Sequence, residues 1–78
     1  MNERKNVLKV EKFSLRAARV NAHLNQTDAA HKLGITHITL SNYEKGKSLP
    51  RIDVALRMAR LYNLPIDALD FSCGAEFR

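Results

Sequence analysis

The segment from 37 to 45 combines side chains that can contact the edges of nucleic-acid bases. If this segment is helical, His37, Ile38, Thr39 and Asn42 lie on an outward side of its first turns. Asparagine can form two hydrogen bonds with adenine, threonine can bond to several bases, and isoleucine can pack against the methyl group of thymine. We therefore expect these four residues to contact bases in a site that contains A·T pairs. The alternative is that His37 and Ile38 are ordinary surface residues.

A second set of side chains near this segment suits the phosphate groups of a nucleic-acid backbone, which position a protein without conveying sequence. Lys45, Lys47 and Arg51 form a basic cluster at and after its end. Such a cluster is also an ordinary feature of a solvated surface. Three uncharged side chains are expected to add hydrogen bonds to phosphates: Asn25, Thr36 and Ser41.

Two short helices joined by a tight turn would position these side chains. Asn25 is a suitable N-cap for the first helix, because its short side chain can accept a bond from an unpaired amide of the opening turn. Gly34 follows the last apolar position, where a left-handed backbone suits a residue without a Cβ atom. Thr36 can cap the second helix, which carries Leu40 and Tyr43 on its inner face. We predict a helix-turn-helix whose second helix contacts the bases.

Three further helices are expected around this unit. The first begins after Ser14 as N-cap and ends near His23, another begins at Pro50 and runs to about position 62, and the last spans 65–70. The inward face of the helix from Pro50 is expected to carry Ile52, Ala55, Leu56, Ala59 and Tyr62, joined by Met58. The predicted fold class is therefore all-α, a compact bundle of five short helices.

The composition agrees with one small domain that has an anionic partner. The chain of 78 residues allows one domain and not two. Its formal net charge of +5 and isoelectric point of about 9.8 favour an anionic partner. Cys73 is the single cysteine, which excludes an intrachain disulfide and fits a reducing compartment. No stretch approaches the about 20 apolar residues of a membrane span, and the N-terminus is unlike a signal peptide, so we expect a cytoplasmic protein.

The sequence contains no pattern that indicates catalysis, a metal site or a cofactor. His23, His31 and His37 would lie on different helices or faces, and Cys73 lacks a histidine in a recognisable nucleophile arrangement. There is also no phosphate-binding glycine loop and no carboxylate pair in an apolar setting. We expect neither an enzyme nor a bound metal or cofactor.

The runs LNQTDAAHKLGIT and LSNYEKGKSLP resemble the helix-turn-helix family of Cro, the lambda repressor and the xenobiotic-response-element regulators. The resemblance covers about residues 14 to 69 and implies a lambda-repressor-like DNA-binding domain over 14–70. Residues 71–78 are then a C-terminal tail and 1–13 an N-terminal arm, which is mobile, forms a short strand, or follows the DNA backbone. The most specific matches, in order and spacing, are Gln26, Ala30, Leu33-Gly34-Ile35, Glu44, Gly46 and Pro50.

The resemblance also implies roles for residues outside the recognition helix. Gln26 matches a family glutamine that contacts the DNA backbone. Arg19 and Glu44 match a partly buried salt bridge that aims the recognition helix. A dimer interface is implied near the end of the fourth helix, the fifth helix and the tail. Its apolar candidates are Leu61, Phe71 and Phe77, although Phe71 can equally close the core of the monomer.

The resulting hypothesis is a sequence-specific transcriptional regulator of phage or bacterial type, a repressor that inserts the helix 37–45 into the major groove. A recognition helix covers only a few base pairs, so a homodimer is expected, with the two helices about 34 Å apart on double-stranded DNA. The alternative is an antitoxin or other protein-interaction module, which has a protein partner and uses DNA binding mainly for autoregulation.

Overall fold

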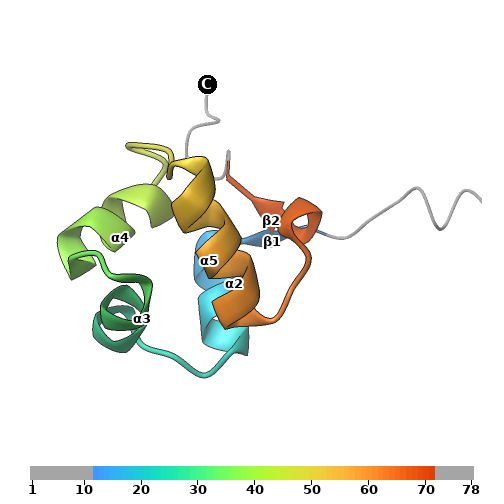
Figure 1. Ribbon diagram of the computed structural model, residues 1–78, viewed down its shortest axis with the longest axis horizontal. Helices are drawn as coiled ribbons and strands as arrows, with labels where there is room; N and C mark the ends of the chain where they lie inside the picture. The colour runs from blue at the N-terminus through green and yellow to red at the C-terminus, as the bar shows by residue number, and fades with distance from the viewer. Residues whose placement is uncertain (1–11, 72–78) are drawn as a thin grey trace, which may run out of the picture.

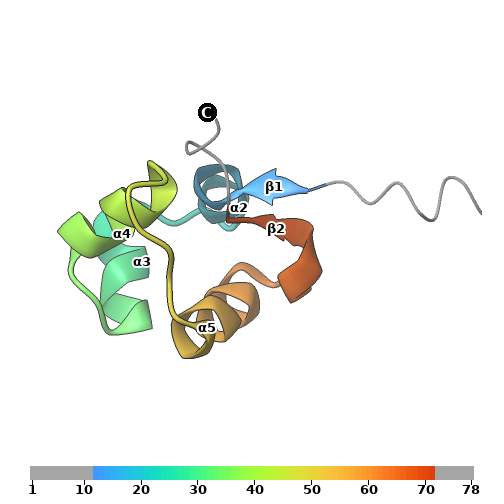
Figure 2. The same cartoon turned by 90° about the horizontal axis from the view of Figure 1, so that it is seen from above.

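The computed structural model describes residues 12–71, and it folds them into four α-helices, one 3₁₀ turn and two very short strands. In chain order these are β1 (Phe13–Ser14), α2 (Leu15–Asn21), α3 (Gln26–Leu33), α4 (His37–Glu44), α5 (Ile52–Tyr62), η1 (Ile66–Ala68) and β2 (Leu69–Asp70). Helices α3 and α4 form one end of the molecule, α2 and α5 lie between, and the strands close the opposite end (Figures 1 and 2).

The first three helices each begin at a side chain that caps them. Ser14, Asn25 and Thr36 accept a hydrogen bond from the backbone amide three residues further on, at 3.0, 2.8 and 3.1 Å respectively. All three caps predicted from the sequence are therefore confirmed. Helix α3 ends at Gly34 and α5 at Asn63, with φ angles of 77° and 58°, which are conformations that glycine and asparagine tolerate best.

The core lies where all four helices meet. Its largest fully buried side chains are Tyr62, Leu15, Leu33, Leu40 and Met58. Small residues, Ala18 and Ala29 among them, are also fully buried and let the helices approach closely. None of the helices of the described residues is long and apolar enough to cross a membrane.

The predicted inner face of α5 is partly wrong. Ile52 and Leu56 are 70% and 44% exposed, and Val54, which was not predicted to face inward, is buried. The other predicted residues are buried as expected: Ala55, Met58, Ala59 and Tyr62. Apolar residues border the buried face of this helix on both sides. Helical spacing therefore predicts that one face is apolar, but it does not decide which of the bordering residues are buried. The helix also begins at Ile52 with Arg51 as N-cap, which places Pro50 before the helix and not in its first turn.

The fifth helix of the expected bundle is not formed. The segment 65–70 instead makes the short 3₁₀ turn η1 and then β2, which pairs in parallel with β1 through Phe13↔Leu69 and Ser14↔Asp70. A helix of so few residues has little stability of its own, while pairing satisfies backbone groups and buries Leu69 to 2% exposure. The fold is thus predominantly helical, and strand β1 begins at Phe13, the last residue of the expected N-terminal arm. The part of that arm before position 12 lies outside the described residues, so the three alternatives given for it stay predictions.

Tyr62 places a hydroxyl in this core. The residue is 1% exposed, and its hydroxyl has no hydrogen-bond partner among the described residues. Burial raises the pKa of Tyr62 to about 12, the Glu44 carboxylate adds to the rise, and the Arg19 guanidinium opposes it. The fold therefore favours the neutral phenol over the phenolate.

Tyr62→Phe is expected to leave the protein folded and as stable as the wild type, or about 1 kcal/mol more stable at neutral pH, since an unpaired buried hydroxyl is removed. The pKa of the phenol rises from 10.0 to about 12 on folding. The folded protein therefore keeps its full stability below pH 10 and loses stability relative to the unfolded chain as the pH rises from 10 through about 12. Wild-type stability in urea unfolding should then fall below that of the variant by up to about 2 kcal/mol at pH 12. Tyr43→Phe is the control and should retain this alkaline loss. If Tyr62→Phe lost as much stability as the wild type between pH 10 and pH 12, the alkaline loss would not come from the Tyr62 phenol.

Candidate nucleic-acid interface

Helix α4 has one face fixed to the core and another turned outward. Leu40 is fully buried and Tyr43 packs against the core cluster. The turn before it is closed by Gly34, and the amide of Ile35 donates to the carbonyl of Ala30 at 3.0 Å. Figure 1 shows α4 at the outer edge of the molecule, beside α3 and away from the strands.

The four predicted base-contacting residues lie on the outward part of α4, although they are not equally exposed. Ile38 is 63% exposed and His37 is also exposed, whereas Thr39 and Asn42 are half-buried. Ile38 and Asn42 are four residues apart and therefore lie one helical turn from each other. The Thr39 hydroxyl accepts a hydrogen bond from Thr36 at 3.0 Å, so it already takes part in the cap.

An ion pair between Arg19 and Glu44 joins α2 to the end of α4. Arg19 Nε donates to Glu44 Oε2 at 2.8 Å and Arg19 Nη2 donates to Oε1 at 3.2 Å. Arg19 Nη1 donates to the carbonyl of Leu24 at 2.9 Å. The two side chains are only 10% and 5% exposed. The residues expected to pair thus do so, and every guanidinium nitrogen is used to hold α4 and the α2–α3 loop in place.

Gln26 takes part in the same network. Its Nε2 donates to Glu44 Oε1 at 3.1 Å, a contact that sequence reasoning did not anticipate. One of its two amide protons is therefore used inside the protein, and the other remains for a ligand. A contact with a DNA phosphate stays a prediction for this residue.

The basic loop after α4 is held close to the helix. Gly46 adopts a φ of 77°, and the amide of Lys47 then turns back to donate to the carbonyl of Asn42 at 2.9 Å. Lys45, Lys47 and Arg51 are all exposed. Arg51 Nε lies 3.9 Å from Asp53 Oδ1, but both side chains are well solvated, so this pair contributes little. The loop thus presents positive charge beside α4.

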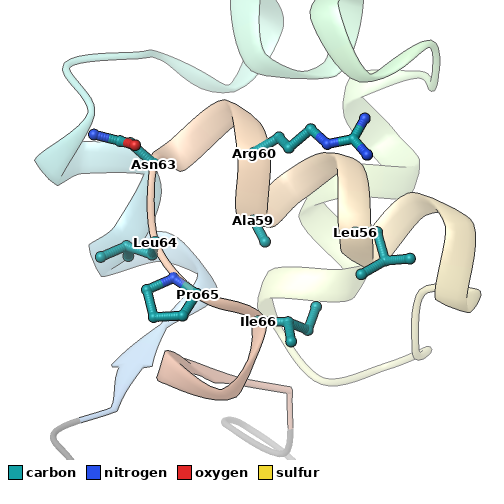
Figure 3. Close-up of a pocket in the computed structure, with 7 residues that line it drawn as sticks. All are labelled: Leu56, Ala59, Arg60, Asn63, Leu64, Pro65 and Ile66. Atoms are coloured by element: carbon teal, nitrogen blue, oxygen red, sulfur yellow. The ribbon is translucent and has the colours of Figure 1, made fainter.

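Two hollows were not foreseen from the sequence. A polar cleft of about 530 Å³ opens between α2, α3 and α4 and includes Arg16. A groove of about 480 Å³ runs between α5 and the chain after it, with Leu56 and Ile66 at one end and Asn63 and Leu64 at the other (Figure 3). Neither hollow has a recognisable sequence motif. The cleft forms from three separate helices, and the groove forms where the chain after α5 folds back on that helix. Within residues 12–71, no three His, Cys, Asp or Glu side chains gather as they would around a metal ion.

Comparisons with known proteins point to one family. The Helix-turn-helix family model matches residues 15–69. The chain is 42% identical over 55 residues to the HTH-type transcriptional regulator ImmR of Bacillus subtilis, a match covering 70% of this chain and 43% of that protein. It is 34% identical over 55 residues to the cryptic phage CTXphi transcriptional repressor RstR of Vibrio cholerae, covering 70% of this chain and 50% of that protein. The chain thus spans half or less of the length of these relatives. No solved structure matches it.

Arg19→Met is expected to destabilise the fold by about 3–5 kcal/mol, because it leaves the Glu44 carboxylate buried without its partner. Urea unfolding monitored by circular dichroism measures this loss. The double variant Arg19→Met/Glu44→Leu should recover most of it, since neither charge then remains. Exposed Arg57→Met on α5 is the control, with a change below about 1 kcal/mol. If Arg19→Met were as mild as the control, the pair would not hold α4 in place.

Proposed function

The chain belongs to the helix-turn-helix family, and from this premise we propose that it is a sequence-specific transcriptional regulator, a repressor that inserts α4 into the major groove of DNA. The two relatives are named as a transcriptional regulator and a transcriptional repressor, which supports this function. The observation that carries it is the outward face of α4, held from behind by the buried Arg19–Glu44 pair. The family is one of DNA-binding regulators and is not an enzyme class.

Base recognition is assigned to the outward residues of α4. Ile38 is exposed at the start of the helix, where an apolar side chain can pack on a thymine methyl group. Asn42 lies one turn further along and can bind adenine through both atoms of its amide. His37 and Thr39 are the neighbours of Ile38 in the chain and complete the proposed reading surface.

The proposed phosphate contacts surround this reading surface: Asn25, Gln26, Thr36, Ser41, Lys45, Lys47 and Arg51. The hydrogen bonds inside the protein limit what some of them can offer. The Asn25 side-chain oxygen caps α3, so its amide nitrogen is the group left for a phosphate. The Thr36 hydroxyl both accepts from an amide and donates to Thr39, so it is the weakest candidate.

Selection of binding sites from a random duplex library tests this function directly. The purified protein is expected to enrich a two-fold site whose half-sites are about one helical turn apart, near physiological salt. Failure to enrich any sequence would leave only non-specific binding through the positive charge and would overturn the proposal.

We assign the expected homodimer interface to the apolar surface of α5. Leu49, Ile52 and Leu56 are 67%, 70% and 44% exposed. Ile66 lines the groove of Figure 3 with Leu56, and it lines a second, smaller hollow with Leu49 and Ile52. Contiguous exposed apolar surface of this kind marks an interaction site. Of the candidates taken from the sequence, Leu61 and Phe71 pack against the core, and Phe77 lies outside the described residues.

The same apolar surface is the observation that supports the second candidate function. A protein partner, such as a toxin bound by an antitoxin, can occupy it in place of a second copy. A small toxin gene in the neighbouring reading frame would favour this reading, whereas an oppositely oriented repressor gene would favour a phage-type switch.

Asn42→Ala is expected to cost about 1–3 kcal/mol of binding free energy at one base position and to relax specificity there. The reason is that the amide contributes a contact to a single base pair. Affinities for the selected site and for its single-base variants, measured by fluorescence anisotropy, check this. Equal weakening on every sequence would contradict a base contact.

Ile52→Ser is expected to shift the protein toward monomer in sedimentation equilibrium and to weaken binding to the two-fold site, while leaving affinity for a single half-site unchanged. Ile38→Ser is the matched control, because it removes an equally exposed isoleucine from α4. It should leave self-association unchanged and reduce the half-site affinity instead. An Ile52→Ser protein that associates like the wild type would exclude this surface from the interface.

A further inference from the structure

The polar cleft between α2, α3 and α4 has an unusual balance of groups. It has a volume of about 530 Å³ and is lined by Arg16, Arg19, Gln26, Ser41, Glu44 and Lys45. Three of its members belong to the network already described, in which Arg19 and Gln26 satisfy both oxygens of Glu44. The carboxylate in the cleft is therefore neutralised by a guanidinium and is not left free to repel an anion.

The remaining groups of the cleft are donors. Arg16 and Lys45 are exposed, and within residues 12–71 neither forms an ion pair or a side-chain hydrogen bond. Gln26 keeps one amide proton, and the half-buried Ser41 adds a hydroxyl. The cleft thus combines two cations and two neutral hydrogen-bond donors with an ion pair that has no net charge. This combination suits a ligand that is negatively charged and only accepts hydrogen bonds.

We propose that this cleft binds one phosphate of the DNA backbone and that Arg16, for which the sequence analysis predicted no role, contacts that phosphate directly. The inference rests on the proposed function and extends it from α4 to α2. Ser41 lies on the same helix as the base-reading residues, and Lys45 is the C-cap of that helix. A strand of the DNA backbone that borders the groove occupied by α4 therefore passes the opening of the cleft. Arg16 then fixes how far α4 is rotated about that strand.

The arrangement also gives Gln26 two simultaneous partners. Its amide joins Glu44 on one side and the phosphate on the other. The phosphate is thereby linked through Glu44 to Arg19, and the group that positions α4 inside the protein is also the group that senses the DNA backbone. This accounts for a half-buried glutamine at the mouth of a cleft whose floor is an ion pair.

The test compares Arg16→Gln with Arg57→Gln on the selected site over a range of salt concentrations. Both variants lose one exposed arginine, but Arg57 lies on α5, outside the cleft. Arg16→Gln should flatten the slope of log affinity against log salt by about 0.9, the amount expected for one lost phosphate contact on duplex DNA. It should also weaken binding about two- to fivefold, equally on specific and non-specific DNA, as for a solvated ion pair. Arg57→Gln should change neither, and Arg16→Lys should restore the slope.

Two further measurements locate the phosphate. If Arg16 and Lys45 share one phosphate, the double variant Arg16→Gln/Lys45→Gln should lose less than the product of the single losses. A duplex in which that phosphate is replaced by an uncharged methylphosphonate should bind the wild type and Arg16→Gln equally. Inorganic phosphate at matched ionic strength should leave the NMR signal of the Gln26 side-chain amide unmoved.

The outcomes distinguish a failure of the proposed function from a failure of the role proposed for the cleft. A wild-type protein that binds no DNA overturns the proposed function itself. A wild type that binds DNA, with Arg16→Gln indistinguishable from Arg57→Gln, overturns only the role of the cleft. If inorganic phosphate alone shifts the Gln26 signal as strongly as DNA does, the cleft is a site for the free anion, and the backbone contact is overturned.

Discussion

The buried ion pair between Arg19 and Glu44 is the interaction on which the rest of the structure depends. Helix α4 is short, and one buried leucine does most to fix it to the core. Tyr43 packs beside it but is only partly buried. The guanidinium binds both carboxylate oxygens and the Leu24 carbonyl, and so it sets the orientation of α4 relative to α2. The two buried charges thus fix the orientation of α4. Their burial has a desolvation cost, which is offset because both groups are fully hydrogen-bonded.

The division of α4 into an inner and an outer face follows from this constraint. The inner face needs few apolar residues, which leaves His37, Ile38 and Asn42 available for contacts outside the protein. Polar groups become more constrained toward the C-terminal end of the helix, where Glu44 and Gln26 bind each other. Helix α4 therefore carries exposed side chains at one end and an ordered polar network at the other, and the proposed DNA interface combines the two.

Local features of the fold could be predicted from the sequence, and features set by distant segments could not. The caps at Ser14, Asn25 and Thr36 depend on only a few neighbouring residues, and all three form as predicted. The inner face of α5 depends on which neighbours cover the helix, and the periodicity placed Ile52 and Leu56 inside when they are exposed. The segment 65–70 was predicted to be helical because Pro65 suits a helix start. Its strand depends on a partner more than fifty residues earlier.

The candidate site divides in the same way. The positions of the residues proposed to contact bases follow from helical spacing along one short segment. The cleft of Arg16 could not be predicted, because it brings together three helices whose relative orientation only the fold defines. Gln26 shows both cases at once: its place at the start of α3 was predicted, and its bond to Glu44 was not.

The pairing of Phe13 with Leu69 brings the two ends of the domain side by side, at the end of the molecule away from α4 (Figure 2). A unit whose ends meet can be inserted into or joined to another polypeptide with little disturbance of its core. This agrees with the length of the relatives, in which the matched 55 residues make up half or less of the chain. The strand pair thus keeps the two ends of the matched region together and away from the outward face of α4.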